Sequence, residues 1–248
     1  MAKQTGLGHR LLVGGVDISG DVTTLDEIAG SLEGLECTGI DKSARERLGG
    51  VRDGMISATS WFNPTGAHAE LGALPTSDVH VMYLAGSAIG APAACMVAQQ
   101  ANYAGTREDD GSLTHETEHR ANGYGLEWGD LLTAGIRSDT TATNGASLDY
   151  GATIDTTSFG LQAYLQVLSF TGTSCTVKLQ ESGDDGGSDS WADVTGGSFG
   201  AQSAVGASRI QTSRTQDVER YLRVATTGTF SECSFVVVVV KNITAVAF

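Results

Sequence analysis

Two histidines in one short segment are the side chains best suited to chemistry. His115 and His119 lie four residues apart in Leu113–His119, a stretch whose pattern is typical of a strand. In a strand both imidazoles point to the same face, roughly 13 Å apart at 3.3 Å per residue. That distance is too large for one metal ion, and a catalytic zinc needs three converging ligands. We therefore expect no metal here and interpret the segment as a polar, exposed strand face.

Two acidic turns offer oxygen ligands instead of nitrogen. Glu108–Asp110 and Asp184–Asp189 are both rich in carboxylates, and hard oxygen donors of this kind bind Ca²⁺. Neither turn has the spacing of an EF-hand, and Asp and Gly are also the residues that hairpin tips prefer. A structural calcium in the second turn and an ordinary hairpin tip both remain open.

Signatures of enzymes and cofactor-binding proteins do not occur in the sequence. It contains no phosphate-binding loop, dinucleotide fingerprint, nucleophile elbow or zinc-protease motif. Gly30–Gly34 has a serine between glycines, but no strand-turn-helix pattern surrounds it. No pair of carboxylates lies in a recognisable glycosidase frame. We expect a protein that is not an enzyme and that uses no cofactor.

The most unusual segment is Asp41–Gly54, where four of the nine basic residues of positions 1–150 fall within eleven positions. Ser43 and Glu46 have capping-box spacing, so one helical turn is possible before Gly49 and Gly50 stop it. The segment lies between two predicted strands, as an interaction loop that docks on another copy or as an ordinary solvated loop. The candidate interface residues are Asp41, Lys42, Arg45, Glu46, Arg47, Arg52 and Asp53.

The elements that position these residues are predicted to be strands, because Gly is abundant at 33 residues and Pro is scarce at 3. A hairpin is expected around Gly14 and Gly15, whose free φ suits a two-residue turn. One short helix is expected, with Thr65 as its N-cap and Pro75 after its end. Further strands are predicted at Leu32–Ile40, Gly54–Phe62, Val79–Leu84, Ala94–Tyr103 and Ser112–Asn122.

A small, polar, turn-rich stretch at residues 138–158 is typical of a linker or of loose edge segments. We therefore predict two domains, 1–145 and 146–248. About six strands in roughly 98 residues give the second domain the size of an immunoglobulin-like β-sandwich. Its last strand, Cys233–Val240, is apolar on both faces, and we expect the first domain or a neighbouring subunit to cover it. The fold class is all-β with one short helix.

Four cysteines are scattered without a C-x-x-C motif, so a zinc site is not expected. We expect buried thiols, as in a cytoplasmic product, while pairing of Cys175 with Cys233 stays open. The N-terminus has no apolar leader segment, and the longest apolar run is too short to span a bilayer. These features predict a protein made in a cytoplasm without membrane insertion.

The formal net charge of −14 argues against a nucleic-acid-binding surface, which needs clustered Lys and Arg. Residues 1–150 hold 20 acidic and 9 basic residues, a balance of −11, whereas the rest of the chain has a balance of −3. Most of the negative field therefore belongs to the first domain, where its simplest role is solubility.

Four further stretches of the sequence are distinctive when taken together: Asp17–Asp26, Cys37–Arg47, Asp53-Gly54 with Trp61–Pro64, and Gly123–Gly129. These stretches resemble the major tail tube proteins of long-tailed, siphovirus-type phages of actinobacteria, and the resemblance covers most of residues 8–136. More weakly, Phe159–Leu165 and Arg220–Val224 resemble the extra C-terminal β-sandwich that some phage tail and surface proteins carry outside.

This resemblance implies a tail-tube-type β-sandwich domain that assembles into stacked homohexameric rings. In that family a loop between early strands reaches a neighbouring ring, and Asp41–Asp53 matches its position. An acidic lumen would conduct genomic DNA during ejection without binding it. The implied partners are further copies of the chain and other tail proteins such as the tape measure protein. The implied location is the virion tail, after assembly in the host cytoplasm.

Two alternatives remain beside a tube subunit. The second domain could bind carbohydrate, because Tyr164, Trp191 and Tyr221 could stack on sugar rings, although Trp191 is better explained as part of the sandwich core. The chain could also be a capsid-decoration protein of a virion.

Overall fold

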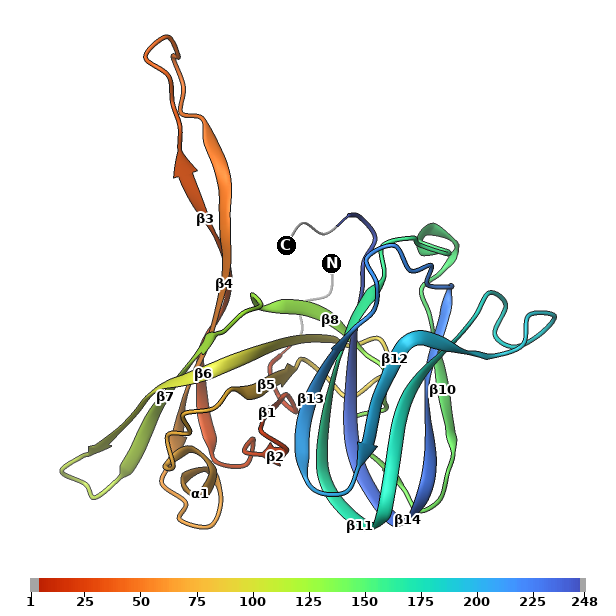
Figure 1. Ribbon diagram of the computed structural model, residues 1–248. Coiled ribbons are helices and arrows are strands. Elements are labelled where there is room, and N and C mark those ends of the chain that lie inside the picture. Colours follow the sequence, from red (N-terminus) through yellow and green to blue (C-terminus); the bar gives the residue numbers. More distant parts are fainter. Residues whose placement is uncertain (1–4, 246–248) are drawn as a thin grey trace. The chain divides into compact units, whose positions relative to one another are not determined.

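The computed structural model describes residues 5–245 and consists almost wholly of strands, which confirms the all-β prediction (Figure 1). The elements in chain order are β1 (Arg10–Val13), β2 (Val16–Asp17), β3 (Val22–Glu36), β4 (Arg47–Trp61), α1 (Ala67–Leu71), β5 (Val79–Leu84), β6 (Pro92–Arg107), β7 (Leu113–Ala121), β8 (Glu127–Leu131), β9 (Arg137–Asp139), β10 (Asn144–Asp149), the 3-10 turn η1 (Ala152–Ile154), β11 (Leu161–Ser182), β12 (Ala192–Gln202), β13 (Gly206–Gln211) and β14 (Tyr221–Lys241).

The chain divides into two compact units. Unit 1 contains the described residues up to 19, then 82–95, and everything from 128 onward; unit 2 contains 20–81 and 96–127. The chain therefore passes from one unit to the other four times, and three of these crossings fall within the continuous strands β5, β6 and β8. The predicted domains 1–145 and 146–248 are continuous ranges, whereas these units are not.

Unit 2 is built on an antiparallel sheet in the order β3-β4-β7-β6. Cross-strand partners share a face of a sheet, so Ile56, His119 and Gln100, which are paired in turn, lie on one face. The Gln100 side chain donates to the carbonyl oxygen of Leu71 in α1 at 2.7 Å. The short helix therefore covers this face, and the other face stays open.

The predicted helix exists, but Thr65 is not its cap. Gly66 occupies the N-cap position without a side-chain bond from within the helix. A carboxylate from a distant loop does the capping instead, since Asp21 Oδ2 accepts the backbone N–H of Ala67 at 2.8 Å. The Asn63 side chain donates to the other Asp21 oxygen at 2.9 Å and fixes the carboxylate. An acidic group at this end also suits the helix dipole.

Unit 1 is a β-sandwich formed mainly by two very long strands, β11 and β14, which pair along most of their lengths. The predicted last strand, Cys233–Val240, is the C-terminal part of β14, which begins at Tyr221. The apolar strand within β14 is buried as predicted, with Val236 and Val237 both fully inaccessible. The predicted N-terminal hairpin also forms, and its Gly15 N–H donates to Gln166 on β11 at 2.6 Å.

Residues 138–158 form edge structure, one of the two predicted alternatives. Here β10 pairs with the Tyr221 end of β14, and β9 pairs farther along the same strand. Arg137 binds Asp139 through both ends of its guanidinium, at 2.8 and 2.7 Å, and also donates to the Val224 carbonyl oxygen at 3.0 Å. This part-buried, hydrogen-bonded ion pair ties the edge strands to the sandwich.

The prediction of an exposed histidine face on β7 is wrong. His115 and His119 do share a face, but it is the one that α1 covers, and His119 is only 1% exposed. Its ring bonds the backbone of Ile56, while Nε2 is buried without a partner. Burial lowers the pKa of His119 from 6.5 to about 4 because the charged form would lose its hydration.

His119 predicts how the stability of unit 2 depends on pH. In the unfolded chain His119 binds a proton below about pH 6.5, whereas in the native state it binds one only below about pH 4. The free energy of unfolding should therefore fall by up to ~3 kcal/mol across this window and stay unaffected by His119 above it. Urea unfolding followed by tryptophan fluorescence tests this. His119→Leu should flatten the profile, and an unchanged slope in that variant would contradict the assignment.

Candidate functional site

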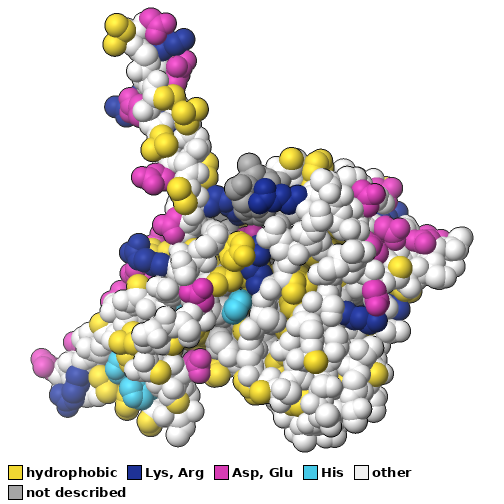
Figure 2. Space-filling view, viewed as in Figure 1, with side chains coloured by type: hydrophobic (Ala, Val, Ile, Leu, Met, Phe, Trp, Pro, Cys, Tyr) yellow, Lys and Arg dark blue, Asp and Glu magenta, His cyan; other side chains and the backbone are white. Residues whose placement is uncertain are grey.

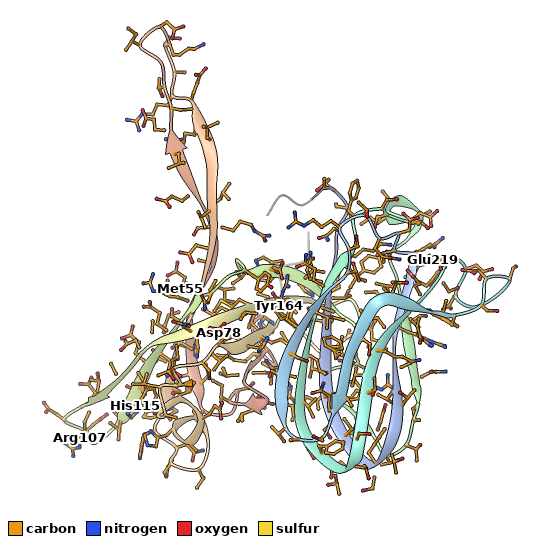
Figure 3. All side chains as sticks on the ribbon, in the orientation of Figure 1. Met55, Asp78, Arg107, His115, Tyr164 and Glu219 are labelled. Carbon is orange, nitrogen blue, oxygen red and sulfur yellow. The ribbon has the colours of Figure 1, made fainter. Side chains whose placement is uncertain are left out.

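The strongest candidate for a functional surface is the far end of the β3–β4 hairpin in unit 2 (Figure 1). β4 pairs with β7 only from Met55 to Trp61, whereas its pairing with β3 continues to Arg47 (Met55 is labelled in Figure 3). Among residues 5–245, no third strand pairs with residues 31–53, so this segment, which we call the arm, is a two-stranded hairpin. Two-stranded hairpins on their own are marginal in water.

The base of the arm packs against a single leucine, Leu126. Gly30 and Gly54 are cross-strand partners, and both lie against Leu126, which is 5% exposed. A Cβ on Gly54 would stand 2.6 Å from the backbone nitrogen of Leu126, so only glycine allows this approach. The Leu126 N–H also points to the carbonyl oxygen of Asp53 at 3.5 Å. The arm is thus anchored by close backbone packing at its base.

Beyond this contact the arm exposes large apolar side chains. Leu35 and Leu48 face each other across the strands and are 56% and 60% exposed. Leu32 is 57% exposed and Val51 is 76% exposed, so neither side chain is buried in a hydrophobic core. Apolar and charged side chains alternate along the arm (Figure 2). A projecting hairpin with this much uncovered apolar surface is typical of an interaction site.

Charged residues are concentrated at the tip. Lys42 lies 3.4 Å from Glu46 and 3.9 Å from Asp41, and Arg45 lies 3.6 Å from Glu36. These exposed pairs contribute little stability on their own. They do hold a fixed pattern of positive and negative charge at the end of the arm.

All seven predicted interface residues therefore belong to the arm, but not to one loop. Asp41, Lys42, Arg45 and Glu46 form the tip, while Arg47 begins β4 and the remaining two lie farther down that strand. The possible helical turn after Ser43 is absent, since residues 43–46 are not helical and β4 begins directly after them at Arg47. Sequence reasoning missed the apolar residues. Their alternation across the glycine-rich stretch was the available signal.

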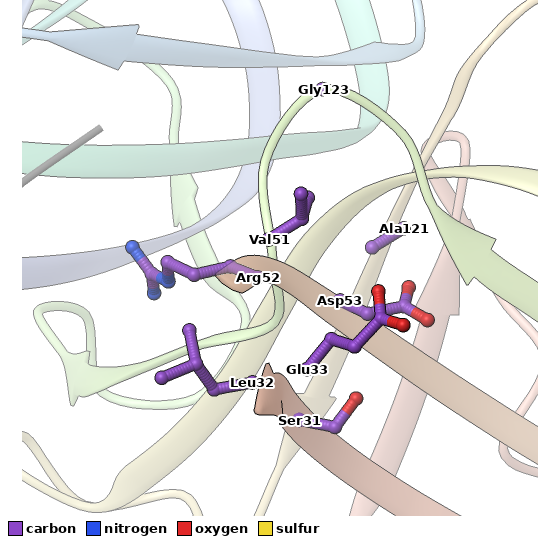
Figure 4. Close-up of a pocket in the computed structure, with 8 residues that line it drawn as sticks. All are labelled: Ser31, Leu32, Glu33, Val51, Arg52, Asp53, Ala121 and Gly123. Atoms are coloured by element: carbon purple, nitrogen blue, oxygen red, sulfur yellow. The ribbon is translucent and has the colours of Figure 1, made fainter. Parts of the chain in front are cut away.

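A shallow groove of about 550 Å³ lies at the base of the arm (Figure 4). It combines apolar walls from Leu32 and Val51 with the carboxylates of Glu33 and Asp53. The groove is open to solvent, so it suits a docked chain segment better than an enclosed small molecule. The lining residues are Ser31, Leu32, Glu33, Val51, Arg52, Asp53, Ala121 and Gly123.

The open face of the unit 2 sheet is acidic. Thr59 donates to Asp26 at 2.9 Å, which places that carboxylate on the face opposite α1. Glu116 pairs with Thr59 and Glu118 with Ser57, so both point to the same side. Glu27 also belongs here, and Arg120 forms an ion pair with Glu118. The result is a polar surface with excess negative charge.

The second acidic turn is closed by its own backbone. The Asp184 carboxylate accepts the N–H groups of Gly187 at 2.9 Å and Ser188 at 2.6 Å. Asp189 accepts the N–H of Gly183 at 2.6 Å. These carboxylates act as hairpin caps. In the described residues no three metal-ligating side chains converge.

The three aromatic residues considered for sugar binding do not form one platform. Tyr164 is buried in unit 1, and its hydroxyl accepts a bond from Arg209 at 3.0 Å (Figure 3). Trp191 is partly exposed and lies outside the sandwich core, contrary to the preferred interpretation. One face of its ring is occupied by Arg223, at 4.2 Å from the centroid. Among the described helices, none is long and apolar enough to span a membrane.

Comparison with known proteins gives likeness in structure only. No protein-family model and no curated protein sequence matches the chain. A chain from the virion of a native gene transfer agent particle is 16% identical, with a TM-score of 0.41, over 51% of this chain and 98% of that one. A chain from the tail of an empty gene transfer agent particle, with C6 symmetry, is 16% identical, with a TM-score of 0.37, over 48% and 94%.

One further neighbour spans nearly the whole chain. The Dit protein of phage SPP1, described as a hub of the adsorption apparatus in phages that infect Gram-positive hosts, is 12% identical, with a TM-score of 0.34. The match covers 93% of this chain and 98% of that one. These values are too low to carry an argument about function, which therefore rests on the arm and the acidic face.

The contact between Gly54 and Leu126 at the base of the arm can be tested directly. Gly54→Ala should lower the free energy of unfolding of unit 2 by about 1–3 kcal/mol, because the new methyl group overlaps the Leu126 backbone. Gly34→Ala is the matched control, since its Cβ would meet only the Arg47 side chain, at 3.4 Å. Urea unfolding measures both. If both variants lower the free energy of unfolding equally, the contact of Gly54 with Leu126 does not anchor the arm.

Proposed function

We propose that the chain is a structural subunit of a phage tail that assembles with copies of itself, with the arm as its main assembly contact. The observation that carries this proposal is the uncovered apolar surface of Leu32, Leu35, Leu48 and Val51 on a hairpin with no third strand. Covering that surface on a second copy would remove it from water and stabilise the arm.

A second copy is the partner that the charges favour. The tip carries ion pairs of both signs, and the groove offers two carboxylates beside apolar walls, so one chain supplies both halves of a mixed contact. Contact between the arm of one copy and a different surface of the next is heterologous. Such contacts close into rings or continue as stacks. The resemblance of residues 8–136 to tail tube proteins favours stacked hexameric rings.

The acidic open face supports the channel role within this proposal. A wall carrying Asp26, Glu27, Glu116 and Glu118 repels the phosphates of DNA, so genomic DNA could pass without binding. We infer that this face lines the channel, and that other tail proteins, such as a tape measure protein, contact the same assembly.

Assembly is tested by negative-stain microscopy and sedimentation of the purified protein. The wild type should form rings or tubes as concentration rises. Leu35→Ser combined with Leu48→Ser should leave monomers with an unchanged circular dichroism spectrum, because both side chains are exposed in the free subunit. Val205→Ser is the matched control, since Val205 is 49% exposed in unit 1. A wild type that is monomeric at all concentrations and salts would contradict the proposal. Single rings without stacking would favour a hub over a tube.

The channel face is tested by charge reversal. Glu116→Lys with Glu118→Lys should make assembled protein retain double-stranded DNA at low salt and release it as salt is raised. Asp109→Lys with Asp110→Lys makes the same change of charge at a hairpin tip and should retain much less. DNA co-sedimentation with the assemblies is the measurement. Equal retention of DNA by the two variants would contradict the proposal that the acidic face lines the channel.

A further inference from the structure

Two cysteine thiols meet inside the sandwich of unit 1. Cys175 on β11 and Cys233 on β14 are both fully buried and belong to the same apolar core. Their side chains lie close enough in this core to influence each other's ionisation. Neither residue lies on the arm or on the acidic face, so the chemistry of this pair is independent of the proposed function.

Strand register shows that this meeting is not an ordinary cross-strand contact. The residue opposite Cys175 is Gly228, and the residue opposite Cys233 is Phe170. The two cysteines are therefore five residues apart along the ladder, which would separate them by ~16 Å if the ladder were straight. For both side chains to lie in one buried core, the ladder must fold over between these two points.

The fold-over occurs at a glycine. The β11–β14 register shifts on either side of Gly172, whose φ is +155°. A Cβ at this position would lie 2.4 Å from the Cα of Phe230, so the strands approach here more closely than any side chain allows. Past this bend, the two halves of the long hairpin become facing layers of the sandwich. Cys175 and Cys233 project into the core from opposite layers.

We propose that Cys175 and Cys233 form a disulfide site that cross-links the two layers of the sandwich when a small-molecule disulfide is present. The two side chains already lie close together, and the core that surrounds them is apolar. In the structure both cysteines are in the reduced form.

The exchange balances with oxidised glutathione as the oxidant. The Cys233 thiolate attacks the glutathione disulfide, forms a mixed disulfide and releases one glutathione thiolate. Cys175 then loses its proton and attacks the Cys233 sulfur, which releases the second glutathione thiolate. Since both sulfurs are buried, the exchange takes place while the sandwich is open during folding.

A disulfide here closes a long loop and restricts the unfolded chain. The expected effect is a rise of about 5–15 °C in the unfolding midpoint of unit 1. This effect should vanish when a reductant is added to the unfolded protein. It should be absent from single Cys→Ala variants at either position.

The experiment refolds the full chain from denaturant in a glutathione redox buffer and, separately, in excess reductant. Tryptic digestion without reduction should link the peptide that ends at Lys178 with the peptide that ends at Lys241. Cys37→Ser removes the one exposed cysteine and serves as the control against random pairing. Differential scanning fluorimetry compares the oxidised and reduced forms of the same chain.

Two results would overturn the proposal. One is refolded protein in the redox buffer that retains both thiols free, as shown by alkylation of Cys175 and Cys233 after denaturation. The other is a linked form whose unfolding midpoint is equal to or lower than that of the reduced form, because a pair held in the correct geometry must stabilise. The linked peptide together with the upward shift supports it.

Discussion

The exposure of the arm is set by the point at which β4 stops pairing with β7, at Met55. From Met55 to Trp61 the strand is part of a four-stranded sheet with one face covered by α1, and its backbone is held from both sides. Toward the tip, β3 is the only described strand that pairs with β4, and Gly54 lies against Leu126 at the base of the arm. The proposed assembly through the arm rests on this change, because a two-stranded segment with exposed leucines is poorly stabilised until another surface covers it.

The same sheet separates two kinds of surface by simple alternation. Residues 115, 117 and 119 of β7 point toward α1, whereas Glu116 and Glu118 between them point away. One strand thus supplies a buried histidine on one side and an acidic wall on the other. A shift of one residue in register would exchange these roles, so the register of β7 is tightly constrained.

In unit 1 the sandwich is formed mainly by two very long strands. β11 and β14 each run through both layers, and Gly172 provides the bend that lets them do so. The consequence is that residues distant along the ladder become neighbours across the core, as Cys175 and Cys233 do. The acidic turn at Asp184 is by contrast local, since its carboxylates bind backbone groups within six residues.

The sequence by itself determined the all-β class, the hairpin at Gly14 and Gly15, the strand at Val79–Leu84 and the burial of the apolar end of β14. These are properties of local patterns: residue alternation, turn residues and apolar runs act over a few positions. It also marked Asp41–Asp53 as unusual from its charge. Only the tertiary structure decided that this segment ends a long hairpin, because strand length depends on which partner a strand finds and where that partner stops. The capping of α1 by Asp21, the burial of His119 and the meeting of the two thiols likewise needed the fold, since each joins residues that no local pattern connects.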